Sequence, residues 1–599
     1  MARKPRNPNG NGQPHTLTTP QAVNAAIWSV CDILRRSNCA GALQYVPELT
    51  WLLFLRILDE QEQREAEAAE IVGDPFQPSL TEHYRWRDWA APYDENGNDP
   101  PVTALGNRRG WLRCLKQNEP PGSFFAFVNN KLLPYLRGLA LQPNATPRQK
   151  VIGQILSGVD RTRVDTERNF ADVLDKLDPI RLETTDPQHI FILSQVYEGL
   201  LLRMGEKGND GGQFFTPRQV IKAMVEVIRP RLGETLYDPS CGTGGFLAQA
   251  YQYLHDREIK DNPAITSDQL DRLKHDTFFG REKENLIYPI ALANLMVHGI
   301  DRPNLWHGNT LTGDAAYDRL FDTAPAQFDV ILTNPPFGGK EGPDAQNLFD
   351  FKTGATQVLF LQHILKTLKD GGRCGIVLDE GVLFRTNETA FVQTKRKLLD
   401  DCELWCIVSL PGGVFTAAGA GVKTNLLFFT KGRPTTQIWY YDLSALKVAK
   451  RQPLSFEEHF KDFIERLPTR SVSERSWTVD FTARQRHAVA TAAPFKAQAQ
   501  QKTDEAAQWK TRLIDLKQHN PRHPAAETEA QDRYQALTKA AREFTAKAQE
   551  IEDAVYDLKA VNPNAKADQE ARTPAELLDF IAEKGQEVAA ALGRLRIAM

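Results

Sequence analysis

A glycine-rich turn after an acidic residue is the first feature of this 599-residue sequence that could do chemistry. Residues 237–247 read YDPSCGTGGFL, so an apolar run ends at an acid and an apolar helix start follows the glycines. Glycines let the backbone turn tightly and approach a ligand. A carboxylate there suits the methionine ammonium group of S-adenosylmethionine, whereas it would repel a nucleotide phosphate. The predicted cofactor contacts are Asp238, Ser240, Gly242, Thr243 and Gly244.

Two later segments could hold the rest of the same cofactor. Glu282 ends an apolar run, and an acid at a strand end accepts hydrogen bonds from a ribose diol. Its distance from Asp238 exceeds the usual spacing of about 20 residues, and we attribute the excess to an insertion in the polar stretch 256–276. Asn309 follows another predicted strand, where its amide can face an adenine ring. In isolation, both residues also fit solvated loops. The predicted contacts in this part are Glu282, Asn309, Thr310 and Leu311.

The strongest signal is a buried strand that stops in Asn-Pro-Pro-Phe. Residues 328–337 read FDVILTNPPF. Two prolines fix φ, so the Asn334 side-chain oxygen and the Pro335 carbonyl form a rigid pair of acceptors for an exocyclic amine. Accepting both amine hydrogens draws the nitrogen lone pair out of ring conjugation and aims it at an electrophilic methyl group. Pro336 completes the turn, and Phe337 can stack on the base, which must be flipped from a duplex to reach this pocket.

The elements that must position these residues alternate between short apolar runs and helix-length segments. This alternation predicts a doubly wound α/β domain with a mostly parallel sheet. Ligands should then lie at the carboxyl ends of its strands. The predicted strands are Thr235–Tyr237, Thr277–Gly280, Val330–Thr333, Cys374–Leu378, Leu404–Leu410 and Thr424–Phe429.

The flanks of this domain have a different character. We expect a disordered tail over 1–20, an α-helical domain over 21–165, the methyltransferase domain over 166–480 with its core at 213–432, and a helical region over 481–599. An unbroken heptad seam in the last region predicts a coiled coil or helical hairpin that ends at Asn562-Pro563. It could pack on its own domain or dock onto a partner. The seam comprises Tyr534, Leu537, Ala541, Phe544, Ala548, Ile551, Val555 and Leu558.

The composition of the sequence argues against several classes of protein. A net charge of -3 gives no chain-wide basic field, so contacts with nucleic acid must be local or shared with a partner. The seven scattered cysteines favour buried thiols in a reducing cytoplasm, and no metal site is implied. The absence of an apolar run of about 18 residues excludes a membrane-spanning helix. Residues 419–424 echo a phosphate-binding loop, but the required glycine spacing is missing.

Together, the motifs at 238–246 and 334–337 resemble the amino-methyltransferases of type I restriction-modification systems, and their order matches the gamma class of N6-adenine enzymes. Residues 212–217, GQFFTP, resemble the extra cofactor motif of this family, in which Gln213, Phe215 and Thr216 would border the methionine end. Further similar segments follow residues 334–337, here called the catalytic loop. They are Phe360–Ile364, Leu368–Gly372, Glu380–Phe384, Leu410–Phe415 and Lys423–Phe429.

The resemblance implies a modification subunit that uses S-adenosylmethionine and works in the bacterial or archaeal cytoplasm. The implied partners are duplex DNA, a separate specificity subunit that reads the target, a second copy of this chain and a restriction/translocase subunit. Four alternatives remain open: a stand-alone DNA methyltransferase, an RNA amino-methyltransferase, a protein-glutamine methyltransferase and a non-enzymatic assembly protein that retains the fold. The sequence departs from the family at Asn309, where many relatives carry Asp. It also has an acidic pair, Asp379-Glu380, for which the sequence offers no physical reason.

Overall fold

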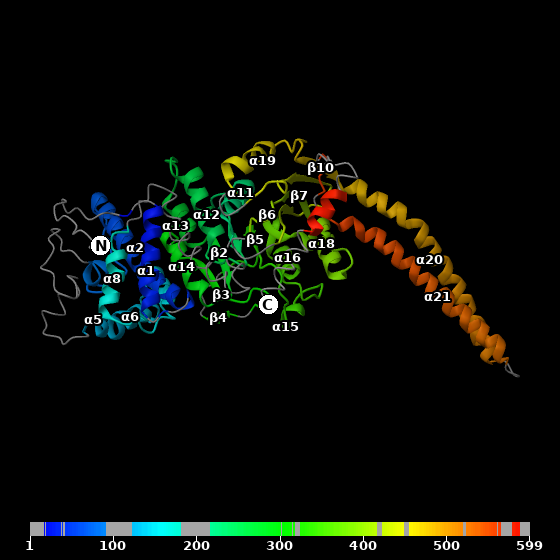
Figure 1. Cartoon of the computed structure of the whole chain (residues 1–599), viewed down its shortest axis with the longest axis horizontal. Coiled ribbons are helices and arrows are strands. Elements are labelled where there is room, and N and C mark those ends of the chain that lie inside the picture. Colours follow the sequence, from blue (N-terminus) through cyan, green and yellow to red (C-terminus); the bar gives the residue numbers. More distant parts are fainter. Residues whose placement is uncertain are drawn as a thin grey trace.

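The computed structural model is elongated, with helices at one end, a mixed sheet in the centre and two long helices that project from the other end (Figure 1). It describes residues 17, 20–37, 39, 42–91, 123–180, 216–300, 302–313, 315–317, 324–415, 422–448, 454–518, 523–559, 561–564 and 578–586. Within this part of the chain, no helix is both long and apolar enough to cross a membrane.

The N-terminal segment is helical, as predicted. The residues spaced for a buried helix face, from Ile27 to Leu34 and from Leu49 to Ile57, all belong to the core. Thr146 caps α7 through a capping box with Gln149. The elements are α1 (Pro20–Arg36), α2 (Ala42–Val72), α3 (Trp86–Trp89), α5 (Ser123–Phe127), η1 (Val128–Leu132), α6 (Leu133–Gly138), η2 (Leu139–Leu141) and α7 (Pro147–Ile155). α8 (Glu167–Leu177) lies beyond the predicted boundary at 165 but packs against α1 and α2 of this segment.

A sheet of ten strands forms the centre, in the order β10-β9-β7-β8-β6-β5-β1-β2-β3-β4. Neighbours from β6 through β5, β1 and β2 to β3 run parallel, whereas β8 runs antiparallel to both β6 and β7. The strands are β1 (Leu236–Asp238), β2 (Phe278–Glu282), β3 (Asn304–Gly308), β4 (Ala315–Tyr317), β5 (Phe328–Thr333), β6 (Leu368–Asp379), β7 (Cys402–Ser409), β8 (Thr424–Lys431), β9 (Gln437–Asp442) and β10 (Ser476–Asp480). The predicted doubly wound α/β class is therefore confirmed, and the sheet extends beyond the six predicted strands.

Helices cover both faces of the sheet because successive strand residues point to opposite sides. Val330 and Leu332 pack with α11, α12 and α14, while Ile331 between them packs with α16 and α18. The polar stretch 256–276 is itself mostly helical, which accounts for the long spacing between β1 and β2. The helices are α11 (Arg218–Ile228), α12 (Gly245–Leu254), η4 (His255–Ile259), α13 (Ser267–His275), α14 (Ile287–Val297), α15 (Pro343–Gln346), α16 (Thr356–Thr367), α17 (Glu380–Phe384), α18 (Thr389–Asp401), η6 (Phe456–Phe460) and α19 (Lys461–Arg466).

The C-terminal helices α20 (Phe481–Gln518) and α21 (Pro524–Asp553) form a hairpin, here called the arm, that extends away from the sheet (Figure 1). Small side chains form most of the buried seam between the two helices, so their backbones approach closely. The buried residues along the two helices are Phe481, Ala488, Ala492, Ala499, Ala506, Leu513, Ala530, Ala541 and Ala548.

The predicted end of the second arm helix, at Asn562-Pro563, is wrong. The α-helix stops at Asp553, and a 3-10 turn, η7 (Ala554–Tyr556), follows. Val555 and Leu558 are buried in the core of the sheet domain, and the Leu558 N–H donates to the Leu383 carbonyl at 3.1 Å. These contacts take the chain out of its helix before the proline is reached.

Candidate active site

The candidate residues converge on the carboxyl edge of neighbouring strands. β1 pairs with both β2 and β5, in register at Tyr237↔Phe279 and Tyr237↔Ile331. Because all three strands are parallel, the turn after β1, the acid at the end of β2 and the loop after β5 lie at one edge. The sheet thus brings together segments that are almost 100 residues apart in sequence.

Asp238 ends β1 as a buried carboxyl, 1% exposed. Its Oδ1 accepts from the Ser240 N–H at 3.1 Å and from the Thr333 hydroxyl at 2.7 Å. Burial raises the pKa of Asp238 to about 7, although both hydrogen bonds act in the opposite direction. No described basic side chain forms a salt bridge with it, so a bound cation would lower its cost of ionisation.

The glycine-rich turn has the strained backbone that glycine permits. Gly242 and Gly244 have φ of 53° and 80°. A Cβ on Gly244 would lie 3.1 Å from the Leu295 side chain, so a larger residue would require this side chain of α14 to shift. Asn294 of the same helix is fully buried and donates from Nδ2 to the Thr243 carbonyl at 2.8 Å. Contacts with α14 therefore hold the turn in place.

Glu282, at the end of β2, contacts this turn directly. Its Oε2 accepts from the Gly242 N–H at 2.9 Å, and its Oε1 accepts from the Glu284 N–H at 2.8 Å. Burial raises the pKa of Glu282 to about 7, with the two N–H groups opposing the shift. The acids at the ends of β1 and β2 thus flank one turn.

The segment after β3 contacts the same turn through Thr310. Its hydroxyl donates to the Pro239 carbonyl at 2.5 Å. Asn309 uses its side-chain oxygen locally, accepting from the Leu311 N–H at 2.9 Å, and the Leu311 side chain is buried. The amide nitrogen of Asn309 and the second lone pair of its oxygen therefore remain for a ligand contact.

Of the two polar atoms in the Asn334 side chain, only the nitrogen has a hydrogen-bond partner among the described residues. Its Nδ2 donates to the Thr216 hydroxyl at 2.9 Å. Its Oδ1 is buried and has no hydrogen-bond partner among the described residues. A buried acceptor without a partner is costly, and in a site it marks the position of a ligand donor. Thr216 was predicted to border the cofactor, and the structure places its hydroxyl against Asn334, the predicted catalytic residue.

The neighbours of Asn334 are also fixed. The buried Pro335 carbonyl accepts from Gln357 Nε2 at 3.5 Å. Phe337 meets Phe415 edge-on, with ring centroids 5.1 Å apart. Pro336 lies between these two and is partly exposed.

Several contacts of the site were not predicted. Thr333 links Asp238 and Ser240, since its hydroxyl also lies 2.8 Å from that of Ser240. Its position directly before Asn334 was the available signal. Asn294, Gln357 and Phe415 lie far from the motifs in sequence, so no local spacing marked them. Two predicted residues, Gln213 and Phe215, lie outside the described part of the chain.

The acidic pair that follows β6 now has an explanation. Asp379 caps α17 by accepting from the Val382 N–H at 3.0 Å. Glu380 forms an ion pair with Lys423 at 2.8 Å, and its N–H donates to the Lys423 carbonyl at 2.9 Å. One acid therefore starts a helix and the other holds the beginning of β8.

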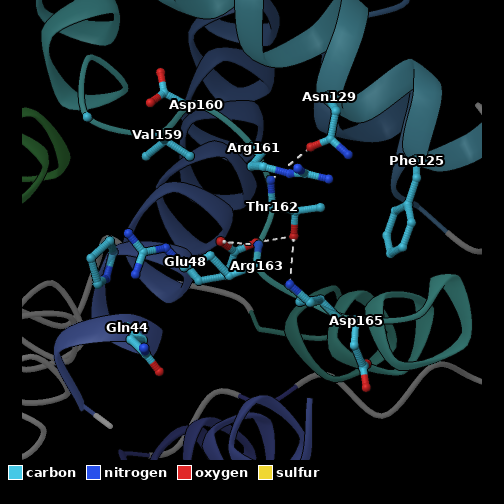
Figure 2. A pocket seen from close by; sticks show the side chains of 13 residues that line it. Gln44, Glu48, Phe125, Asn129, Val159, Asp160, Arg161, Thr162, Arg163 and Asp165 are labelled. Carbon is cyan, nitrogen blue, oxygen red and sulfur yellow. Dashed lines mark hydrogen bonds between the residues drawn. The ribbon is translucent and has the colours of Figure 1, made fainter. Parts of the chain in front are cut away.

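A separate cavity of about 720 Å³ lies in the N-terminal helices. Figure 2 shows Thr162 between Glu48 and Asn129: its hydroxyl donates to the Glu48 carboxylate, and its N–H donates to Asn129 Oδ1 at 2.8 Å. Burial raises the pKa of Glu48. None of the predicted site residues lines this cavity, and the paired groups on its wall hold the segment 158–165 in place.

Comparisons with known proteins match this geometry. The family model described as N-6 DNA Methylase matches residues 188–482, and the HsdM N-terminal domain matches residues 23–136. The type I restriction enzyme EcoEI methylase subunit of Escherichia coli is 35% identical over 445 residues, which cover 73% of this chain and 81% of that protein. The chain belongs to the type I restriction enzyme methylase subunits.

Solved structures agree with this membership. A modification subunit from Vibrio vulnificus YJ016 is 31% identical with a TM-score of 0.64, covering 79% of this chain and 94% of that one. A chain from work on complex assembly and conformational transition of the type I restriction-modification system is 32% identical with a TM-score of 0.58, covering 97% and 98%. The methylase subunit is thus an adenine-specific DNA methyltransferase with a role in a type I system, and its family implies the use of S-adenosylmethionine.

Proposed function

We propose that this methylase subunit transfers a methyl group from S-adenosylmethionine to N6 of an adenine flipped out of duplex DNA, at a target read by a separate specificity subunit. The observation that carries the proposal is the buried Asn334 Oδ1 without a partner among the described residues, next to the turn that Asp238 and Glu282 flank. This oxygen requires a hydrogen-bond donor, and a hydrogen of the adenine amine would supply it.

The turn after β1 fits the cofactor on its chemistry. A methionine ammonium group would offset the burial of Asp238, a ribose diol would donate to Glu282, and the amide nitrogen of Asn309 would face the adenine ring. Because Gly242 and Gly244 have no side chains, such a ligand could approach the backbone of the turn closely. When bound, S-adenosylmethionine supplies the electrophilic methyl group.

The catalytic loop orients the nucleophile. Thr216 holds Asn334 Nδ2, so that Oδ1 accepts one hydrogen of the adenine amine while the Pro335 carbonyl accepts the other. Phe337 stacks on the flipped base, and Phe415 supports that ring edge-on. Because the groups are already in place, positioning and exclusion of water supply most of the rate enhancement.

The rest of the chain serves assembly. We assign the helices at 21–165 and the region 481–599 to contacts with partners, on either side of the methyltransferase domain at 166–480. The arm presents two long helices whose outward faces are largely exposed, and these suit docking onto the specificity subunit. A second copy of the chain would close around the DNA, a restriction/translocase subunit would join the complex, and the site of action is the cytoplasm.

The test is to incubate the purified chain with labelled S-adenosylmethionine and mixed-sequence duplex DNA, with and without its specificity subunit. N6-methyladenine that forms only with the partner is the expected result. Formation by the chain alone would indicate a stand-alone enzyme. Label in RNA or protein, and none in DNA, would contradict the proposal.

A further inference from the structure

Gln357 bridges the ends of β5 and β6. Its side chain, near the start of α16, is 3% exposed. Nε2 donates to the Pro335 carbonyl at 3.5 Å, and Oε1 accepts from the Asp379 N–H at 3.1 Å. The pairing between the two strands ends at Thr333↔Ile376. Gln357 therefore links the two segments just beyond the point where their main-chain pairing stops.

The direction of the Pro335 carbonyl depends on one backbone torsion, ψ of Pro335. The rings of Pro335 and Pro336 set φ of both residues, and the second ring also limits ψ of the first to extended values. Within that range, ψ of Pro335 decides where the carbonyl oxygen points. A donor on the interior side restrains this angle. The oxygen has two lone pairs, so the bond from Gln357 leaves one for a substrate donor.

We propose that Gln357 is a positioning residue for methyl transfer: it sets the direction of the Pro335 carbonyl, so that this oxygen and Asn334 Oδ1 accept the two amine hydrogens together. This inference rests on the proposed function. Each acceptor of the catalytic loop then has a support of its own, since Thr216 holds Asn334 from the segment before α11 and Gln357 holds Pro335 from α16.

The chain contains a matched control on the same helix. Gln362 is 7% exposed, and its amide also bonds to a backbone, accepting from the Phe351 N–H at 3.0 Å and donating to the Phe351 carbonyl at 2.9 Å. Replacing either glutamine with methionine keeps the side-chain length and removes two hydrogen bonds. Only Gln357→Met removes a bond to the catalytic loop.

The experiment compares Gln357→Met, Gln362→Met and wild type as full chains in complex with the specificity subunit. Three quantities are measured: the single-turnover rate of N6-adenine methylation of mixed-sequence duplex DNA, the dissociation constant of S-adenosylmethionine, and Tm. Gln357→Met should be about tenfold slower than Gln362→Met. Cofactor affinity and Tm should match between the two variants, because their structural losses are alike.

Gln357→Glu adds a pH signature. The introduced carboxylate keeps an acceptor for the Asp379 N–H but has no donor for the Pro335 carbonyl. When protonated it can donate again, and burial raises its pKa toward the assay range. At saturating cofactor, its rate relative to wild type should therefore recover as the pH falls from about 8 to about 6.

The outcomes separate the two proposals. A wild-type complex that methylates DNA while Gln357→Met and Gln362→Met have equal rates would overturn the role of Gln357 alone. So would a Gln357→Glu variant whose relative rate is the same at every pH. A wild-type complex that transfers no methyl group to DNA would overturn the proposed function and the positioning role with it.

Discussion

At the carboxyl edge of the sheet, the buried groups are acids and amides, whereas in the arm they are mostly alanines. Asp238 and Glu282 are buried without a salt-bridge partner among the described residues, and Asn334 keeps an unpaired acceptor. The arm instead buries small side chains such as Ala499 and Ala506 and leaves its polar residues in solvent. Unsatisfied polar capacity indicates where a ligand completes the structure, and a close-packed apolar seam indicates rigidity. Changes at the edge should therefore impair chemistry, and changes in the arm should impair assembly.

The largest effect is expected at the catalytic loop. Asn334→Ala removes the buried acceptor for the amine, so the rate of methyl transfer should fall by about 100-fold or more. Cofactor affinity should stay within about twofold of wild type, since Asp238 and Glu282 are unchanged. Rate and binding are measured on the complex with the specificity subunit. Equal losses of both would show that Asn334 is structural.

A charge in the arm tests the other region. Ala506→Glu places a carboxylate in the seam, where a buried unpaired charge is costly, and binding to the specificity subunit should weaken by about tenfold or more. Gln508→Glu introduces the same group at an exposed position nearby and serves as the control. Calorimetry with the specificity subunit and with S-adenosylmethionine measures both affinities. Loss of cofactor binding in Ala506→Glu would contradict the separation of the two regions.

Asp238→Asn should reduce cofactor affinity by about 10- to 100-fold, because a hydrogen bond to a charged group is lost. The asparagine oxygen can still accept from Ser240 and Thr333, so the fold contacts remain. Removal of a buried charge should leave Tm equal or higher. Titration with S-adenosylmethionine and thermal unfolding check the two statements, and a lower Tm with unchanged affinity would assign Asp238 a structural role only.

The last expected effect requires no substitution and is the pH dependence of cofactor binding. The pKa values of Asp238 and Glu282 are both raised to about 7 by burial. A bound ammonium group favours ionised Asp238, and hydroxyl donors favour ionised Glu282. Affinity should therefore be constant well above pH 7 and fall as the pH decreases through that value. At pH 6 the loss is roughly tenfold for each carboxyl that must be ionised. In Asp238→Asn only the contribution of Glu282 should persist, and an identical profile in both proteins would refute this assignment.

Local sequence was enough for the parts of the site that lie on one segment. The run from Phe328 to Phe337 determined a buried strand and the geometry of the catalytic loop, because proline fixes φ wherever it stands. The turn at Gly242 and Gly244 was equally readable, since only glycine accepts such a backbone at low cost. Periodicity likewise predicted the helices of the N-terminal segment and the hairpin of the arm.

Tertiary structure decided what packs between segments. Gln357, Asn294 and Phe415 join the site through a helix or a loop distant in sequence, and their residue types carry no spacing signal. Likewise, α21 ends at Asp553, and Val555 and Leu558 beyond it are buried in the core of the sheet domain. The sequence by itself determined which groups we expect to do the chemistry, through backbone restrictions that are local. Which groups hold them in place depended on strand order and helix packing, which no single segment encodes.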